Sequence, residues 1–194
     1  MSIPAGPRPL TYDDYAELPD DGNRYELIDG EIFVTPAPVP RHQIVSRNLE
    51  WTLYAYVRER ALGEVLYAPI DVVLDPAAKT QIVQPDLVYI SKENLRIIGE
   101  KYIEGPPDLI VEIFSPRTRR RDVRVKSELY ARYGVASYWL VDPDIDRIEV
   151  LELAAGRYEE KARADCPAVL RPARFPGLEI SLADVFARGG NRNL

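Results

Sequence analysis

Cysteine and histidine are almost missing from this sequence. Of 194 residues, only Cys166 is a cysteine and only His42 is a histidine. A single cysteine cannot form an internal disulfide, so a reducing interior is the simplest setting for the protein. One cysteine and one histidine also provide too few ligands for a zinc site. These two scarcities exclude a disulfide scaffold and a zinc centre.

Long apolar segments and two familiar catalytic motifs are missing as well. No stretch is long and apolar enough to span a membrane, and the beginning, MSIPAGPRPL, lacks the apolar run of a secretion signal. We therefore expect a soluble, cytoplasmic protein with no membrane contact. The chain has no G-x-x-x-x-G-K phosphate loop. No G-x-S-x-G motif surrounds Ser115, which disfavours a serine hydrolase using Ser115 and His42.

Positive charge is scarce overall but concentrated in one place. The formal net charge is −6, which taken alone argues against non-specific binding of nucleic acid. Residues 117–126 nevertheless carry a local charge of +5, which leaves −11 for the rest of the chain. Such a patch is either a phosphate-binding surface or a solvated helix start. Basic side chains at a helix N-terminus oppose the helix dipole, so helix stability does not explain the cluster.

The segment from residue 106 to residue 142 predicts a strand, a basic turn, a helix and a second strand. Residues 108–114 are apolar on both faces, as in an interior strand, but Glu112 interrupts them. A buried carboxylate costs several kcal/mol unless it is paired, hydrogen-bonded or bound to a metal (roughly,). In the following helix, Lys126 falls on the apolar side, beside Leu129 and Tyr130. Both charges require a partner.

The remaining chain predicts an α/β fold. Other helices are expected at residues 11–18, 43–62 (ended by Gly63) and 181–186. Strands are expected at residues 24–35 (a hairpin turning at Asp29-Gly30), 64–75 (kinked at Pro69), 83–90, 136–142, 147–153 and 158–162. We therefore predict one domain, residues 1–194, in which helices cover a central mixed β-sheet. Its core spans about 24–187, and a flexible arm and tail flank it.

Asp86 is a second acid in an apolar setting, because it shares a strand face with Val88 and Ile90. If its strand neighbours that of Glu112, the two carboxylates can meet and bind a hard divalent cation such as Mg²⁺. The alternative is two unrelated strand-end caps. Lys126 would then orient a metal-bound water or offset charge on a phosphate. Its own alternative is a lysine that extends past Tyr130 to the surface.

These motifs resemble a known family. The segments QPDLVYI, PPDLIVEIFSPRTRRRD and GVASYWLVDP, the lysine of the intervening helix, the hairpin RYELIDGEIFVTPAP and the turn ALGEV are similar to the Uma-two family of restriction-endonuclease-like proteins. The resemblance covers residues 25–186. That family is placed in the PD-(D/E)XK nuclease superfamily, which implies a restriction-endonuclease-like fold and a metal-dependent phosphodiesterase core.

The resemblance implies site residues, which are carried over one by one. Asp86 and Glu112 would be the metal-binding acids, with Mg²⁺ or Mn²⁺ as the cofactor. The superfamily lysine stands two residues after the second acid, where this chain has Phe114, so Lys126 would replace it from the helix. Additional candidates, each with a structural alternative, are Asp108 (or a strand-start residue), Glu26 (or a hairpin surface charge) and His42 (or a helix-entry polar residue).

The leading hypothesis is therefore a Mg²⁺-dependent endonuclease that hydrolyses phosphodiester bonds of DNA with a metal-activated water. The expected contacts to the nucleic-acid backbone are Arg119, Arg120, Arg121 and Arg124. A homodimer is expected, because cleavage of a duplex requires two active sites or two visits. The alternative is a catalytically inactive nuclease-fold module that binds nucleic acid or protein, favoured by Phe114 and the acidic body. A purely structural homo-oligomer subunit is the third reading.

Overall fold

The computed structural model describes residues 8–35, 37–114 and 119–188, and within helix α3 it describes side chains from residue 123 onward. The predicted flexible ends fall largely outside these ranges. The helices are α1 (Tyr12–Ala16), α2 (Pro40–Glu59), α3 (Arg119–Arg132), α4 (Leu182–Val185) and the 3₁₀ helix η1 (Lys92–Ile97). The strands are β1 (Arg24–Ile28), β2 (Glu31–Thr35), β3 (Gly63–Tyr67), β4 (Val72–Val73), β5 (Ile82–Val83), β6 (Leu87–Ser91), β7 (Ile103–Glu104), β8 (Leu109–Ile113), β9 (Ser137–Asp142), β10 (Arg147–Ala154), β11 (Arg157–Asp165), β12 (Val169–Leu170) and β13 (Ile180–Ser181).

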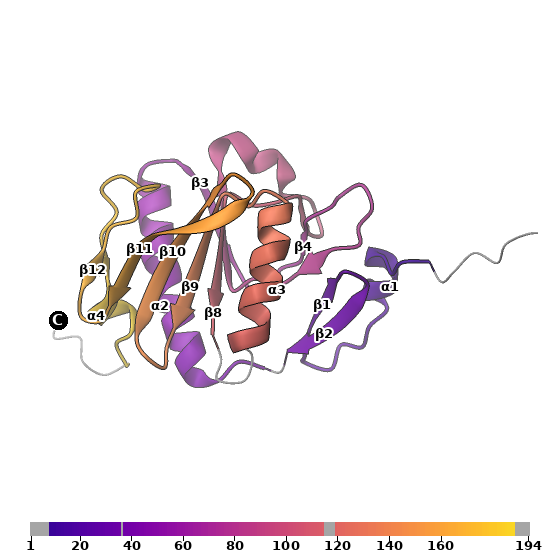
Figure 1. Cartoon of the computed structure of the whole chain (residues 1–194), viewed down its shortest axis with the longest axis horizontal. Coiled ribbons are helices and arrows are strands. Elements are labelled where there is room, and N and C mark those ends of the chain that lie inside the picture. Colours follow the sequence, from indigo (N-terminus) through magenta and orange to yellow (C-terminus); the bar gives the residue numbers. More distant parts are fainter. Residues whose placement is uncertain (1–7, 36, 115–118, 189–194) are drawn as a thin grey trace, which may run out of the picture.

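A six-stranded mixed sheet in the order β11-β10-β9-β8-β6-β3 forms the centre of the molecule (Figure 1). Strand β8 lies inside it, antiparallel to β6 and parallel to β9. The parallel pair is joined through helix α3, as a parallel connection requires. The predictions of a central mixed sheet and of an interior strand carrying Glu112 are therefore confirmed.

The two long helices cover opposite faces of this sheet, because alternate residues of β8 point to opposite sides. Leu109 and Val111 pack with Leu49 and Leu53 of α2. Ile110 packs in a second cluster that contains Leu129 and Tyr130 of α3, together with Tyr138 and Leu140 of β9. The strand is apolar on both faces because both faces are covered, and Glu112 projects toward the α3 side.

A second sheet has the order β2-β1-β5-β4-β7 and carries the N-terminal hairpin. The hairpin is confirmed: Ile28 pairs with Glu31, and Asp29 and Gly30 both have positive φ angles, 48° and 85°. Two positive φ angles in a two-residue loop match the right-handed twist of the strands that it joins.

Two strand predictions are wrong in the same way. The stretch predicted as one kinked strand, 64–75, is β3 in the large sheet and β4 in the smaller one. The stretch 83–90 is likewise divided between the sheets: it contains the end of β5 in the smaller sheet and most of β6 in the large one. Asp86 therefore lies just before β6 rather than within a strand. Both stretches are mostly apolar, and periodicity does not reveal that the chain changes sheets within them.

The end of the long helix also differs from the prediction. Helix α2 ends at Glu59, and Ala61 has a positive φ angle of 50°. Gly63 does not stop the helix but begins β3, with a φ angle of 143°. A Cβ atom at Gly63 would lie 2.0 Å from the carbonyl oxygen of Ile90, so glycine is required by the close approach of β6.

The C-terminal elements agree with the sequence. Strands β10 and β11 pair antiparallel around the turn at Ala155 and Gly156, as predicted, although both are longer than expected. Helix α4 begins after Ser181, whose hydroxyl accepts a hydrogen bond from the Asp184 amide at 3.3 Å. Within the described ranges, the helices are all too short or too polar to cross a bilayer.

The glycine at the start of β3 generates a first prediction. Gly63→Ala should lower the free energy of unfolding by at least about 3 kcal/mol, because backbone strain adds to a clash with the β6 backbone. Gly134→Ala is the matched control: its φ angle is also positive, 78°, but no atom lies within 4 Å of the added Cβ. The control should lose only about 1–2 kcal/mol. Urea unfolding of both variants measures the difference, and equal losses would contradict the proposed close contact.

Candidate active site

Asp86 and Glu112 occupy opposite positions on neighbouring segments of the large sheet. Leu87 of β6 pairs with Val111 of β8 in an antiparallel register, so the next position along each strand sets Asp86 opposite Glu112. The main-chain amide of Ile113 donates a hydrogen bond to Asp86 Oδ2 at 2.8 Å, which fixes the aspartate against β8. The adjacent strands on which the sequence prediction depended are present.

Lys126 lies between two carboxylates. Its Nζ atom is 3.0 Å from Glu112 Oε1 and 2.8 Å from Glu26 Oε1. The lysine is 8% exposed and Glu26 is 5% exposed, so neither charge reaches bulk solvent. Lys126 therefore does not extend to the surface past Tyr130, and Glu26 is not a surface charge of the hairpin.

Further hydrogen bonds hold these carboxylates in place. The Tyr130 hydroxyl donates to Glu112 Oε1 at 2.6 Å. The main-chain amide of Gln84 donates to Glu26 Oε1 at 2.9 Å. A buried ion pair is favourable only when such bonds satisfy its remaining polar atoms. The arrangement is thus a connected network rather than an isolated lysine–glutamate contact.

The network shifts the protonation of its members. Burial, opposed by Lys126 but assisted by Glu26 and Asp86, raises the pKa of Glu112 to about 7. Burial also opposes the charged form of Lys126, but the carboxylates of Glu112 and Glu26 outweigh it and raise the pKa of the lysine. The lysine is therefore charged at neutral pH, whereas Glu112 is poised to exchange a proton there.

Asp86 is held by a separate set of donors. Its Oδ1 atom accepts from Arg24 Nη1 at 2.8 Å, and its Oδ2 atom lies 3.1 Å from His42 Nε2. Although burial opposes its charge, the hydrogen bonds and charges of His42 and Arg24 lower the pKa of Asp86. An ionised Asp86 can only accept, so the Nε2 atom of His42 carries the proton of this contact.

The donor set fits a hard divalent cation. Mg²⁺ is commonly held by one or two carboxylates, with water and substrate phosphate completing its octahedron. Asp86 and Glu112 supply two such carboxylates, and a cation bound there would offset part of the negative charge that, together with burial, raises the pKa of Glu112. The described ranges hold no group of three or more metal-ligating side chains, so no cage made of protein atoms alone is present there.

The other predicted residues are not all part of this cluster. Asp108 lies at the opposite end of β8 from Glu112, where it accepts hydrogen bonds from the Ser91 amide at 2.7 Å and from Asn94 at 3.0 Å. It acts there as a structural residue. Arg124 is exposed on α3 and pairs with Glu128 at 3.2 Å. Ser115 and the side chains of Arg119, Arg120 and Arg121 lie outside the described residues.

Two members of the site were not predicted, although each left a signal. Arg24 stands two residues before Glu26 on β1, so both side chains lie on the same face of that strand. Tyr130 follows Lys126 by four residues, which makes the two neighbours on one face of α3. A search for polar residues at these spacings from a suspected acid or lysine would have found both.

The raised pKa of Glu112 generates a second prediction. The folded protein binds this proton more tightly than the unfolded chain, so the stability that the group contributes falls as the pH rises from about 4.5 to about 7. Glu112→Gln, which resembles the protonated side chain, removes this dependence. As the pH rises across this window, the unfolding free energy of wild type should therefore fall relative to that of the variant, by as much as about 3 kcal/mol.

Urea titrations at several pH values measure that difference. Glu128→Gln, which changes an exposed glutamate on α3, is the control and should parallel wild type. A difference between wild type and Glu112→Gln that stays constant across the window would show that Glu112 titrates as an ordinary surface acid.

Comparisons with known proteins identify the family and the fold. The fold matches the crystal structure of a putative nuclease belonging to DUF820 from Anabaena variabilis, with a TM-score of 0.73 and 21% sequence identity, over 92% of this chain and 98% of that one. No curated protein matches the sequence. The model of the Uma2 family, described as "Putative restriction endonuclease", matches residues 12–183. The chain therefore belongs to the Uma2 family.

Proposed function

We propose that the protein is a metal-dependent endonuclease that hydrolyses phosphodiester bonds of DNA. The observation that carries this proposal is the convergence of Asp86, Glu112 and Lys126, two acids from adjacent strands and a buried lysine from the covering helix. Membership of a family of restriction-endonuclease-like proteins supports nucleic acid as the substrate. The acids and the lysine are the groups that phosphodiester hydrolysis requires.

Asp86 and Glu112 would hold the cation, Mg²⁺ or Mn²⁺. When bound, such a cation activates water and polarises a phosphoryl oxygen. The chain itself places the two acids: Ile113 fixes Asp86 through its amide, and Tyr130 orients Glu112 through its hydroxyl. Positioned acids of this kind lose little order when substrate arrives.

Lys126 would supply positive charge where phosphate charge develops. Its ammonium already neutralises the acidic site in the absence of a ligand, and it can donate to a phosphate oxygen or to the attacking water. Phe114, at the usual lysine position, packs in the apolar cluster that also contains Leu129 and Tyr130 of α3. The helix therefore provides the amine while the strand position contributes to packing.

The arginines at the start of α3 would contact the DNA backbone. Arg124 belongs to this group, and its ion pair with Glu128 is solvent-exposed on both sides. Exposed pairs of this kind contribute about 0–1 kcal/mol, so a phosphate can replace Glu128 at little cost. A homodimer would bring two such sites to the two strands of a duplex.

A catalytically inactive binding module is the second candidate, and one observation favours it. Asp86 and Glu112 are already neutralised by Arg24 and Lys126, so the fold does not require a metal ion for its charge balance. Salt-dependent DNA binding that persists in Glu112→Gln, together with wild-type protein that never cleaves, would support this candidate.

Single substitutions separate metal binding from chemistry. Asp86→Asn and Glu112→Gln should lose Mn²⁺ binding and at least about 100-fold of cleavage, whereas Lys126→Met should retain the metal and lose cleavage. Titration calorimetry with Mn²⁺ and nicking of supercoiled plasmid measure the two properties. Asp108→Asn is the control, because that aspartate lies away from the site and should preserve both. Wild-type protein that binds neither Mg²⁺ nor Mn²⁺ would refute the proposal.

Arg24 provides a further test, because its guanidinium occupies the Asp86 oxygen that a cation would share. Arg24→Gln should raise Mn²⁺ affinity roughly five- to thirtyfold, as expected when one charged hydrogen bond no longer competes. Arg41→Gln is the matched control, since Arg41 pairs with Asp146 at 2.6 Å instead. Unchanged or weaker binding in Arg24→Gln would mean that the cation does not use Asp86.

A further inference from the structure

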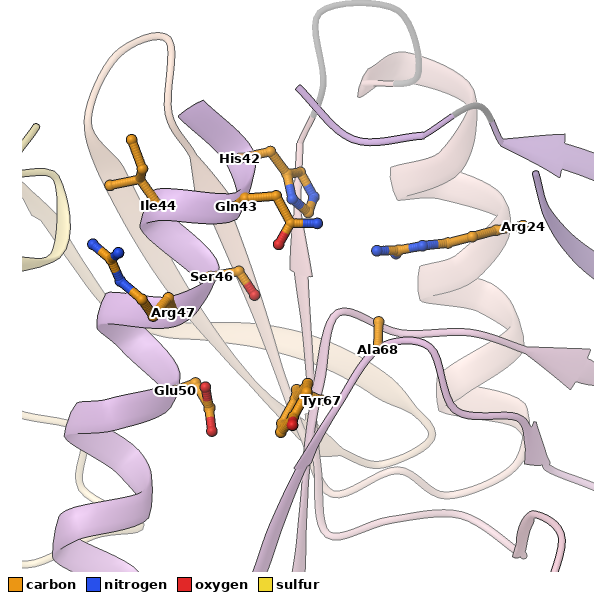
Figure 2. Close-up of a pocket in the computed structure, with 9 residues that line it drawn as sticks. All are labelled: Arg24, His42, Gln43, Ile44, Ser46, Arg47, Glu50, Tyr67 and Ala68. Carbon is orange, nitrogen blue, oxygen red and sulfur yellow. The ribbon is translucent and has the colours of Figure 1, made fainter. Parts of the chain in front are cut away.

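A pocket of about 400 Å³ opens beside Asp86 (Figure 2). It lies between the first turns of α2 and the segment in which the chain leaves β3 for the smaller sheet. Polar side chains, among them Arg24, His42, Gln43 and Ser46, share its walls with apolar surface. Its volume lies in the range of small-ligand sites, which is about 300–1,000 Å³.

The pocket borders the two side chains that hold the first acid of the proposed active site. Arg24 and His42 line it, and the same two side chains hold the carboxylate of Asp86. In Figure 2 the Arg24 side chain extends toward the pocket from the side opposite α2. A ligand that fills the pocket therefore contacts the residues that set the charge and position of the first acid.

Two features of the pocket favour an anion. Arg24 brings a guanidinium group to its wall, whereas the guanidinium of Arg47 turns away from the pocket and donates to Asn48 Oδ1 at 3.2 Å. Helix α2 begins here without an acidic residue in its first turn and without a side-chain cap, so its amide dipoles are not offset.

His42 adds an independent indication of a ligand. The residue is 6% exposed, and its Nδ1 atom has no hydrogen-bond partner among the described residues. A buried polar atom left unpaired costs about 1–3 kcal/mol. Because the histidine lines the pocket, a bound molecule can relieve that cost.

Tyr67 gives the pocket an aromatic wall. It ends β3 and is 61% exposed. Exposed aromatic rings beside cationic groups form the stacking surfaces on which single-stranded nucleic acids bind. Gln43 and Ser46, on the facing side of α2, offer donors and acceptors to the edge of a base.

We propose that this pocket binds one unpaired nucleotide of the substrate strand, next to the phosphodiester that is cleaved. The base stacks on Tyr67, and its phosphate is bound by Arg24. A base within a duplex cannot enter such a pocket without leaving the stack. The preferred substrate is therefore single-stranded DNA or DNA with unpaired nucleotides at the site, an inference that rests on the proposed nuclease function.

The test measures binding without metal and separately from cleavage. Titration calorimetry of the full chain with dAMP, deoxyadenosine and inorganic phosphate, in EDTA, should give the tightest binding for dAMP. Tyr67→Ala should weaken it about 5- to 100-fold, the loss expected for one stacked base, and Tyr67→Phe should preserve it. Trp51→Ala is the control, because Trp51 is an equally exposed aromatic residue on α2 that does not line the pocket.

A second arm identifies the source of the nucleotide. A single-stranded hexamer of deoxyadenosine should bind at least as tightly as dAMP and more tightly than the matching duplex, with the same loss in Tyr67→Ala. Binding of inorganic phosphate as tight as that of dAMP, or unchanged binding in Tyr67→Ala, would overturn the nucleotide pocket. Tight dAMP binding without strand binding would assign the pocket to a free nucleotide and also overturn the proposal.

Different results would refute the endonuclease function and the nucleotide pocket. If Tyr67→Ala loses dAMP while wild type never cleaves DNA with Mg²⁺ or Mn²⁺, the pocket stands and the endonuclease does not. If wild type cleaves duplex and single strands alike and Tyr67→Ala cleaves both at the wild-type rate, the endonuclease stands and the pocket is refuted.

Discussion

The buried ammonium of Lys126 is the interaction on which the rest of the site depends. It joins helix α3 to β8 through Glu112 and to the hairpin strand β1 through Glu26. Removing one partner of a buried ion pair leaves an unpaired charge, at a cost of about 3–5 kcal/mol. The two sheets are therefore linked at this point by charge as well as by apolar packing, and the position of the acids follows from that link.

Charge balance explains how three buried carboxylates are accommodated close together in the folded core. Glu112 and Glu26 share the lysine, while Asp86 uses Arg24, His42 and a main-chain amide. Each carboxylate is thus stabilised before any ligand arrives, at the price of occupying oxygens that a cation would use. A cation and a phosphate bound together would replace these internal partners with new ones of the same sign, so the exchange is close to neutral in total charge.

Local patterns predicted much of this, and long-range pairing accounts for the rest. Glu112 and Lys126 were recognisable because each places a charge on an apolar face, and the hairpin because Asp29-Gly30 prefers its turn. The changes of sheet near Pro69 and before Asp86 were missed, since apolar runs look alike in either sheet. Arg24 was missed because its partner lies 62 residues away, and only the assembled sheets bring them together.

The hairpin has one consequence for the charge of the site. Strand β1 carries both Arg24 and Glu26, one cation for the aspartate and one anion for the lysine, yet it pairs with β5 at a single register position, Leu27 with Ile82. A small outward shift of this strand would remove one charge of each sign and leave the net charge of the remaining site unchanged. Moving the hairpin away would thus expose an acid and an ammonium together. The acid could then bind a cation, and the ammonium could bind a phosphate.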